Sequence, residues 1–158
     1  MKLFKIGNLF FILLFVTLSA HAEIVLQTFE KQTYQSILEN ENQQSFLLVL
    51  WSLDCPPCMD ELSMLGGLHQ QFPDKKIILV STDSEAQSDE IMQIMNKFKL
   101  TGLPQWVFGN ESPQYLRYSI DPLWYGELPR SYFHTAETRQ AVSGKLKKAD
   151  LIRWFNAG

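Results

Sequence analysis

The sequence has only two cysteines among 158 residues, Cys55 and Cys58, and they stand three positions apart. This scarcity excludes a scaffold stapled by several disulfides, the usual solution for small exported domains with small cores. A bridge across so short a loop also constrains the unfolded chain very little. The pair therefore favours a chemical role, although a structural disulfide or an incidental pair of thiols stays open.

Clusters of basic residues are also missing, and the formal net charge is −3, from 14 basic and 17 acidic residues. This excludes nucleic-acid binding, which needs a basic patch. There is no internal repeat, low-complexity tract or interdomain linker. With 46% hydrophobic and 20% charged residues, the composition is that of one ordinary globular domain.

The one long hydrophobic run lies at the N-terminus. Two lysines fall within the first five residues, an apolar stretch covers 9–16, and an A-x-A signal ends at Ala22. These features predict a cleaved signal peptide, 1–22, and a mature domain, 23–158, with 12 basic and 17 acidic residues. The apolar stretch is shorter than a spanning helix needs, but an uncleaved membrane anchor remains the alternative. We therefore expect an exported, periplasmic protein, in a compartment where disulfides persist.

Hydrophobic patterning along the mature chain predicts an α/β fold with one antiparallel extension. The continuous apolar run Phe46–Trp51 is typical of a strand buried on both faces of a mostly parallel sheet. Strands are expected at 23–29, 46–51, 76–81 and 105–108, a hairpin at 130–135 and 140–143, and helices at 31–39, 59–72, 84–99, 113–119 and 147–155. The resulting architecture is a central mixed sheet flanked by helices.

The chemical motif is Cys55-Pro56-Pro57-Cys58, which follows the buried strand and opens an amphipathic helix. A helix N-terminus offers unpaired N–H groups and a positive dipole potential, so a thiolate is favoured there. We therefore expect Cys55 to be the nucleophile. Cys58 lies one turn further in, where its thiol can resolve a mixed disulfide.

The residues around the nucleophile predict a reducing centre rather than a strongly oxidising one. Pro56 and Pro57 lack two N–H donors that would otherwise stabilise a thiolate. Asp54 adds a like charge beside it. Both effects favour the oxidised protein, and a protein that prefers to be oxidised is the better reductant.

Metal binding is the more specific alternative to redox chemistry, because C-x-x-C pairs also occur in metal sites. Two cysteines supply only two of the four ligands of a closed structural zinc site, and His69 and His134 show no ligand spacing to the pair. We expect no cofactor and no resident metal. A copper-handling module that uses the two thiols on soft Cu(I) remains an alternative, as does a redox-inert interaction domain.

Two stretches resemble the thioredoxin superfamily, specifically its TlpA/ResA-like branch of exported thiol–disulfide oxidoreductases. The first, 48–62, combines an apolar strand, Trp51, the C-x-x-C motif and Glu61 three residues after the second cysteine. The second, 125–133, is similar to the family's Gly-x-x-Pro-Thr-x-Phe segment. The resemblance extends from Phe46 to Phe155.

The resemblance implies roles for several further residues. Pro129 is expected to be a cis-proline that faces the redox centre and presents the backbone of Leu128 to an extended substrate segment; Pro104 is the competing candidate. Trp51 and Pro56 are expected to line the substrate site, with a plain core tryptophan as the alternative for Trp51. Glu61 is expected to tune Cys58 and relay its proton, with a solvated helix glutamate as the alternative.

This chain departs from the family pattern at four positions. Val49 stands where thioredoxins carry a buried acid, so the buried proton acceptor is expected to be Glu61. Ser63 replaces a common proline, and Arg130 replaces the threonine after the cis-proline. Asp54 and Arg130 are both expected to flank the substrate groove and to alter the choice of partner.

The functional expectation is a monomeric periplasmic reductase of protein disulfides. In the resembled branch such proteins often reduce apo-cytochrome c, as in cytochrome c maturation, or metal-site cysteines. The expected partners are protein thiols and disulfides, with an upstream membrane electron donor. An oxidase or isomerase is the alternative within the same chemistry.

Overall fold

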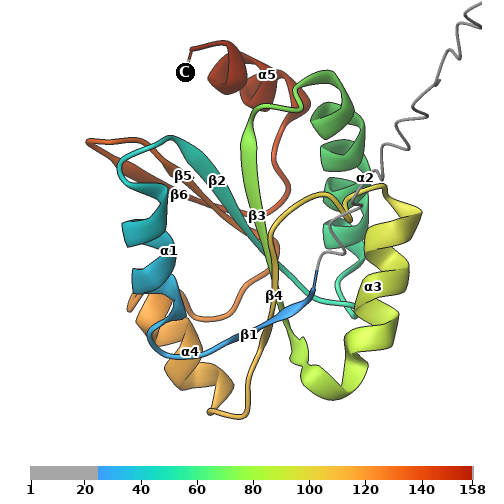
Figure 1. Ribbon diagram of the computed structural model, residues 1–158, viewed down its shortest axis with the longest axis vertical. Coiled ribbons are helices and arrows are strands. Elements are labelled where there is room, and N and C mark those ends of the chain that lie inside the picture. The colour runs from blue at the N-terminus through green and yellow to red at the C-terminus, as the bar shows by residue number, and fades with distance from the viewer. Residues whose placement is uncertain (1–24, 158) are drawn as a thin grey trace, which may run out of the picture.

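The computed structural model describes residues 25–157, so the predicted signal peptide, 1–22, lies outside the described residues. Six strands form one sheet in the order β1-β4-β3-β2-β5-β6 (Figure 1). The strands are β1 (Gln27–Phe29), β2 (Phe46–Trp51), β3 (Lys76–Ser84), β4 (Gln105–Phe108), β5 (Arg130–His134) and β6 (Arg139–Ser143). The first four run parallel, and β5 is antiparallel to both β2 and β6. This confirms the predicted α/β class and its antiparallel hairpin.

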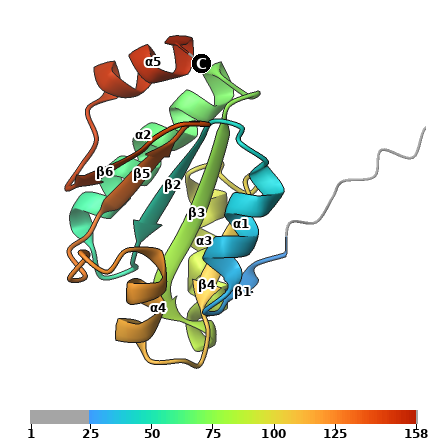
Figure 2. The ribbon, with the colours of Figure 1, turned by 90° about the vertical axis from the view of Figure 1, so that its left-hand side faces the viewer.

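Helices cover both faces of the sheet. They are α1 (Thr33–Glu41), α2 (Pro56–Gln71), α3 (Ser88–Lys97), α4 (Pro113–Ile120) and α5 (Lys148–Ala157), with a short 3-10 turn η1 (Glu85–Gln87). Core residues of α2, α3 and α5 pack against one face, and those of α1 and α4 against the other. Figure 2 shows α1 and α4 in front of the sheet.

The central strand β2 divides the core in two. Leu47, Val49 and Trp51 point into the cluster under α2, α3 and α5. Their neighbours Phe46, Leu48 and Leu50 point into the cluster under α1 and α4. All six residues are buried, as the continuous apolar run predicts, because alternate side chains of a strand face opposite sides of the sheet.

The prediction of a helix at 84–99 is wrong for its first turn, residues 84–87. Strand β3 continues to Ser84, and η1 intervenes before α3 begins at Ser88. The cause is local capping: the N–H of Ser84 donates to Oε1 of Gln87, 3.3 Å away, in a capping box that closes a tighter turn. The first strand is also shorter than predicted, since β1 begins only at Gln27.

Two adjacent glycines in α2 give a matched pair of stability predictions. A Cβ at Gly66 would overlap the carbonyl oxygen of Phe98, whereas a Cβ at Gly67 would meet nothing within 4 Å. We expect Gly66→Ala to lower the free energy of unfolding by about 1–3 kcal/mol through overpacking. Gly67→Ala should raise it by about 1 kcal/mol through helix propensity. Urea unfolding measures both, and equal effects of the two variants would contradict the packing of α2 against Phe98.

Candidate redox site

The two cysteines form a disulfide where the carboxyl end of β2 meets the start of α2. Cys55 is the N-cap of α2, and its Cα lies 5.2 Å from that of Cys58. Its Sγ accepts a hydrogen bond from the N–H of Cys58, 3.3 Å away. Pro56 and Pro57 carry no N–H, so this is the backbone donor of the first turn that reaches the Cys55 sulfur.

The two sulfur-bearing residues differ in access. Cys55 keeps 8% of its surface exposed, whereas Cys58 is fully buried. Asp54, Pro56 and Pro57 around them are exposed. An incoming partner can therefore touch Cys55 first, and Cys58 can be reached only through it.

Asp83, which sequence reasoning missed, fixes the loop that precedes the nucleophile. Its carboxylate accepts hydrogen bonds from Ser52 Oγ at 2.8 Å and from the N–H of Leu53 at 2.9 Å. Ser81 Oγ donates to it as well, at 2.6 Å. The signal available in the sequence is positional: Asp83 lies at the carboxyl end of β3, which is parallel to β2, so both strands end at the same edge of the sheet.

Glu61 lies inside the protein, so a solvated helix glutamate is the wrong alternative for this position. Its side chain is fully buried and accepts hydrogen bonds from the N–H of Leu146 at 2.6 Å and from Ser131 Oγ at 3.3 Å. Burial raises its pKa above the ordinary value, against the opposing effect of these hydrogen bonds and of the Lys145 charge. It is three residues beyond Cys58 and hence on the same side of α2.

The peptide bond between Leu128 and Pro129 is cis, as the resemblance implies, and it is the one cis bond within residues 25–157, which rules out Pro104. Because β5 pairs with β2 so that Arg130 faces Leu50, Pro129 comes next, opposite Trp51. Leu128 packs against the core cluster that contains both cysteines. Across the described chain, neither the N–H nor the carbonyl oxygen of Leu128 makes a hydrogen bond.

The other expected substrate-site residues are divided between core and surface. Trp51 is 1% exposed and belongs to the same cluster as the cysteines, so it supports them from within and offers a substrate almost no surface. Pro56 is exposed beside Cys55.

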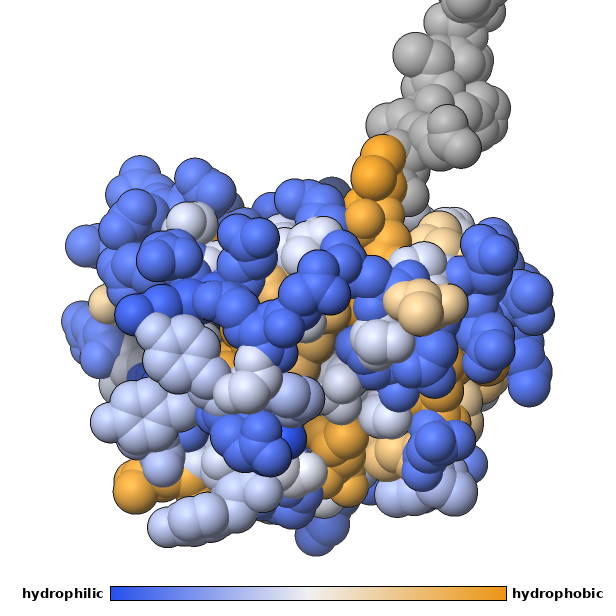
Figure 3. Space-filling view, turned by 90° about the horizontal axis from the view of Figure 1, so that it is seen from below, coloured by the Kyte–Doolittle hydropathy of each residue, from blue (hydrophilic) through white to orange (hydrophobic). Residues whose placement is uncertain are grey.

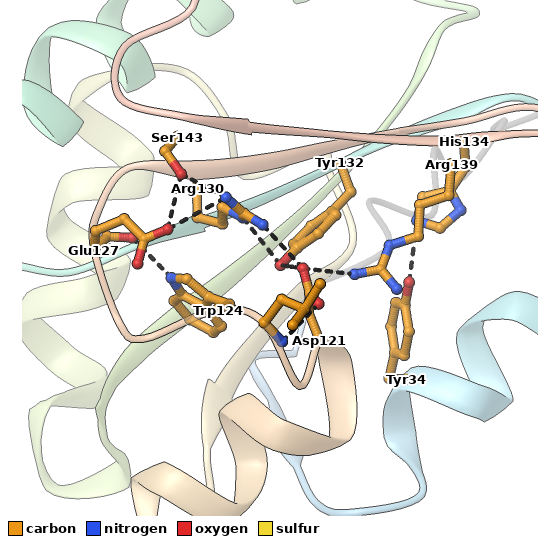
Figure 4. A network of polar contacts seen from close by, with 10 residues as sticks. Tyr34, Asp121, Trp124, Glu127, Arg130, Tyr132, His134, Arg139 and Ser143 are labelled. Carbon is orange, nitrogen blue, oxygen red and sulfur yellow. Dashed lines mark hydrogen bonds and ion pairs between the residues drawn. The ribbon is translucent and has the colours of Figure 1, made fainter.

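Arg130 does not flank the groove with a free side chain, which corrects the prediction made for it. Its side chain is 11% exposed, and its guanidinium forms an ion pair with Asp121 at 2.9 Å. Figure 4 shows Arg130, Tyr132 and Arg139 all directed at the Asp121 carboxylate. Burial of a hydroxyl beside this carboxylate raises the pKa of Tyr132 to about 12. A polar network thus lies directly behind the cis-proline.

His134 takes no part in the redox centre. It stacks on Phe46 and is bonded to Tyr34 Oη, on the face of the sheet away from α2. Burial and the Arg139 charge lower its pKa to about 4, so it is neutral at pH 7. Within residues 25–157, no three His, Cys, Asp or Glu side chains are grouped to hold a metal ion.

The residues next to Cys55 on either side, Asp54 and Pro56, are exposed. Three cavities of about 290–490 Å³ lie elsewhere, and none is lined by either cysteine. Figure 3 looks onto the end of the molecule where the parallel strands terminate, and apolar side chains appear there as separate patches between hydrophilic ones. Among the described residues, no helix is both long and apolar enough to cross a membrane.

Comparison with known proteins decides the fold. No protein-family model and no curated protein matches the chain. The structure of MTB DsbF in its mixed oxidised and reduced forms matches with a TM-score of 0.60 at 18% identity, over 75% of this chain and 84% of that one. This chain has the thioredoxin fold.

Two further thioredoxin-fold structures agree with this assignment. A secreted Mycobacterium tuberculosis disulfide oxidoreductase homologous to E. coli DsbE matches with a TM-score of 0.59 at 15% identity, over 76% of this chain and 86% of that one. A thiol:disulfide interchange protein of the thioredoxin family from Chlorobium tepidum TLS matches with a TM-score of 0.56 at 17% identity, over 75% and 82%. At such identities the thioredoxin fold is what the likeness establishes.

Proposed function

We propose that this protein is an exported thiol–disulfide oxidoreductase that reduces protein disulfides through Cys55 and Cys58. The observation that carries the proposal is the asymmetric pair at the mouth of α2. Cys55 caps the helix and keeps some exposed surface, and Cys58 is buried one turn deeper within bonding distance. That is the arrangement that a nucleophile and its resolving thiol require.

The reaction starts from the dithiol form. The Cys55 thiolate attacks one sulfur of a substrate disulfide, forms a mixed disulfide and releases one substrate thiolate, which takes up a proton. The Cys58 thiol gives up its proton, attacks Cys55 Sγ, closes the Cys55–Cys58 disulfide and releases the second substrate thiolate. Two electrons pass to the substrate, and a dithiol electron donor must then return the protein to its reduced form.

The direction of electron flow follows from how weakly the Cys55 thiolate is stabilised. One backbone N–H reaches its sulfur, the two prolines supply none, and Asp54 stands exposed beside it. We expect a reduction potential nearer to about −270 mV than to about −120 mV, the values of a reducing and of a strongly oxidising member of this fold. Equilibration with glutathione buffers measures it, and a value near the upper figure would contradict the reductase proposal.

A substitution in the motif tests the physical reason for that potential. Pro57→His restores an N–H and places a cationic group near the Cys55 thiolate, which stabilises the reduced protein. We expect the potential to rise by some tens of millivolts, where about 30 mV corresponds to a tenfold change in the equilibrium constant. Because Pro57 is exposed, the change should leave the fold intact. An unchanged potential would show that donors at the helix mouth do not set it.

Glu61 is proposed to accept the Cys58 proton during resolution. Only the ionised carboxylate can accept a proton. Because burial raises the pKa of Glu61 above its ordinary value of 4.5, this ionised form appears at a higher pH than usual. In the natural protein, the rate of mixed-disulfide resolution should therefore receive an additional increase as the pH rises above 4.5 and Glu61 ionises. The Glu61→Gln variant should lack this additional increase. At lower pH the two proteins should converge, because both then carry a neutral side chain.

Single-turnover quench measurements across this pH range give the ratio of the two resolution rates. Glu90→Gln is the matched control, an exposed helix glutamate that should leave the profile unchanged. A constant ratio of natural to Glu61→Gln rates at every pH would rule out the relay.

The proposal also includes several finer points: membership of the TlpA/ResA-like branch, periplasmic location after cleavage at Ala22, a role in cytochrome c maturation, a membrane electron donor and a monomeric state. Mass spectrometry after aerobic purification separates it from copper handling. A mass lower by two hydrogen atoms that dithiothreitol restores supports redox chemistry, whereas stoichiometric copper supports the binding module. N-terminal sequencing of the exported protein tests the leader.

A further inference from the structure

The segment that links α4 to β5 exposes two large apolar side chains. Leu123 is 75% exposed and Tyr125 is 86% exposed. The segment runs from Asp121 to Leu128 and ends at the cis peptide bond. We call it the 121–128 segment.

Its first residue is held by an unusual number of bonds. The Asp121 carboxylate accepts hydrogen bonds from the N–H of Leu123 at 3.0 Å and from Tyr132 Oη at 3.0 Å. Two guanidinium groups reach it as well, those of Arg130 at 2.9 Å and Arg139 at 3.1 Å. Charge-assisted bonds of this kind are the strong ones, and here they are mostly shielded from water.

Arg130 also holds the far end of the segment. Its guanidinium donates to the Glu127 carboxylate at 3.2 Å and to Ser143 Oγ (Figure 4). Trp124 Nε1 donates to the carbonyl oxygen of Glu127 at 2.8 Å and closes the turn between the two ends. A single side chain, Arg130, therefore ties both ends of the segment to the hairpin, and Leu123 and Tyr125 stay outside because the backbone between the ties is fixed.

The segment is continuous with the redox site. Leu128 packs against the cluster that contains the cysteines and keeps its backbone N–H and carbonyl free. Tyr125 is three residues away, so its Cα lies within about 11 Å of that of Leu128. An extended substrate that pairs with Leu128 covers up to about 10 Å in three residues, enough to bring a side chain to Tyr125.

We propose that the 121–128 segment is a braced recognition element that selects extended protein segments with an apolar side chain about three residues from the reactive cysteine. Tyr125 and Leu123 provide the contact, and Arg130 and Asp121 are positioning residues. The inference rests on the proposed thiol–disulfide exchange and adds a substrate class to it. Exposed aromatic side chains on a rigid support are typical anchors of binding surfaces.

The test uses two peptides, each with one cysteine in a mixed disulfide with glutathione. One carries phenylalanine three residues before and three residues after the cysteine, and the other carries serine at both positions. The Cys55 thiolate attacks the peptide sulfur and releases glutathione, and Cys58 then releases the peptide thiol. We expect the second-order rate constant of the reduced protein to be about tenfold higher for the phenylalanine peptide. A factor of this size corresponds to one modest contact that the phenylalanine peptide makes and the serine peptide does not.

Tyr125→Ser should reduce this preference to within about twofold, as expected once the anchor is lost. Its rate with glutathione disulfide, which is too small to reach the segment, should stay unchanged. Tyr115→Ser is the matched control, since Tyr115 lies in the first turn of α4 with the Lys31 ammonium over its ring and is not part of the 121–128 segment; it should keep the full preference. Arg130→Lys, which cannot bond both ends at once, should also lose the preference and keep its rate with glutathione disulfide.

Equal rates of the natural protein with the two peptides, or a preference that survives Tyr125→Ser, would overturn the recognition element alone. Failure of the natural protein to react with either peptide and with glutathione disulfide would instead overturn the proposed exchange function. Tyr125 is so exposed that its replacement should fold normally, so the result does not depend on the stability of the Arg130 variant.

Discussion

Replacement of Cys55 by alanine is expected to abolish disulfide exchange, with a loss on the order of a thousandfold or more, because the attacking sulfur is removed. Cys58 cannot take over, since it is fully buried and reached only through Cys55. The fold should survive, because a bridge across so few residues contributes little to stability. Reduction of insulin by the variant, with dithiothreitol as donor, measures the loss.

Met59→Leu is a suitable control for this variant, since it changes a half-buried neighbour of the pair without touching either sulfur. It should keep most of the activity. Substantial insulin reduction by Cys55→Ala in folded protein would mean that the catalytic sulfur has been misassigned.

Replacement of Asp121 by alanine is expected to have the largest effect on stability. It removes the carboxylate between Arg130 and Arg139 and leaves Arg130, whose side chain is 11% exposed, without its strongest partner. Breaking a mostly buried ion pair by removing one member costs about 3 kcal/mol or more. Urea unfolding at pH 7 measures the loss in free energy. Asp150→Ala, which breaks an exposed pair with Arg153, should change stability far less.

The Asp121 effect should depend on pH in a defined direction. Burial opposes its ionisation, but the N–H of Leu123 and the partners Arg130, Tyr132 and Arg139 outweigh it and hold its pKa below the usual 3.8. A carboxyl with a lowered pKa stabilises the folded state above pH 3.8 and loses that contribution as pH falls through the folded-state value. The stability difference between the natural protein and Asp121→Asn should therefore shrink below pH 3.8. A difference that is constant from pH 7 to pH 3 would contradict the network.

The fold could be predicted in large part because its central strands carry strong one-dimensional signals. The predicted bounds of Phe46–Trp51 and Gln105–Phe108 agree with the structure to the residue. The first is an apolar run between two serines, and the second is a short, mostly apolar run between a proline and a glycine. The start of α3 was missed because Ser84 and Gln87 form a capping box whose side-chain bonds override the helical periodicity that follows.

The chemistry of the site could be predicted where it depends on neighbours in sequence, or where the family resemblance implies it, as for the cis peptide bond before Pro129. Cys55 at the N-cap and Cys58 one turn deeper follow from spacing alone. The bonds of Asp83 to Ser52 and Leu53 and the pairing of Arg130 with Asp121 could not be found in this way, because they join residues 9 to 31 positions apart through the packing of the sheet. Sequence therefore gave Arg130 a surface role, whereas its side chain lies in a network behind the cis-proline.

The central claim is that Cys55 exchanges disulfides with partner proteins and Cys58 resolves the product. The most direct measurement is purification of Cys58→Ala, in which the mixed disulfide cannot resolve, followed by mass spectrometry of what is bound to it. The account predicts covalent complexes with proteins of the same compartment, linked at Cys55 and released by dithiothreitol. A folded variant that carries no thiol-linked partner, or whose partners remain after Cys55 is also replaced, would contradict it.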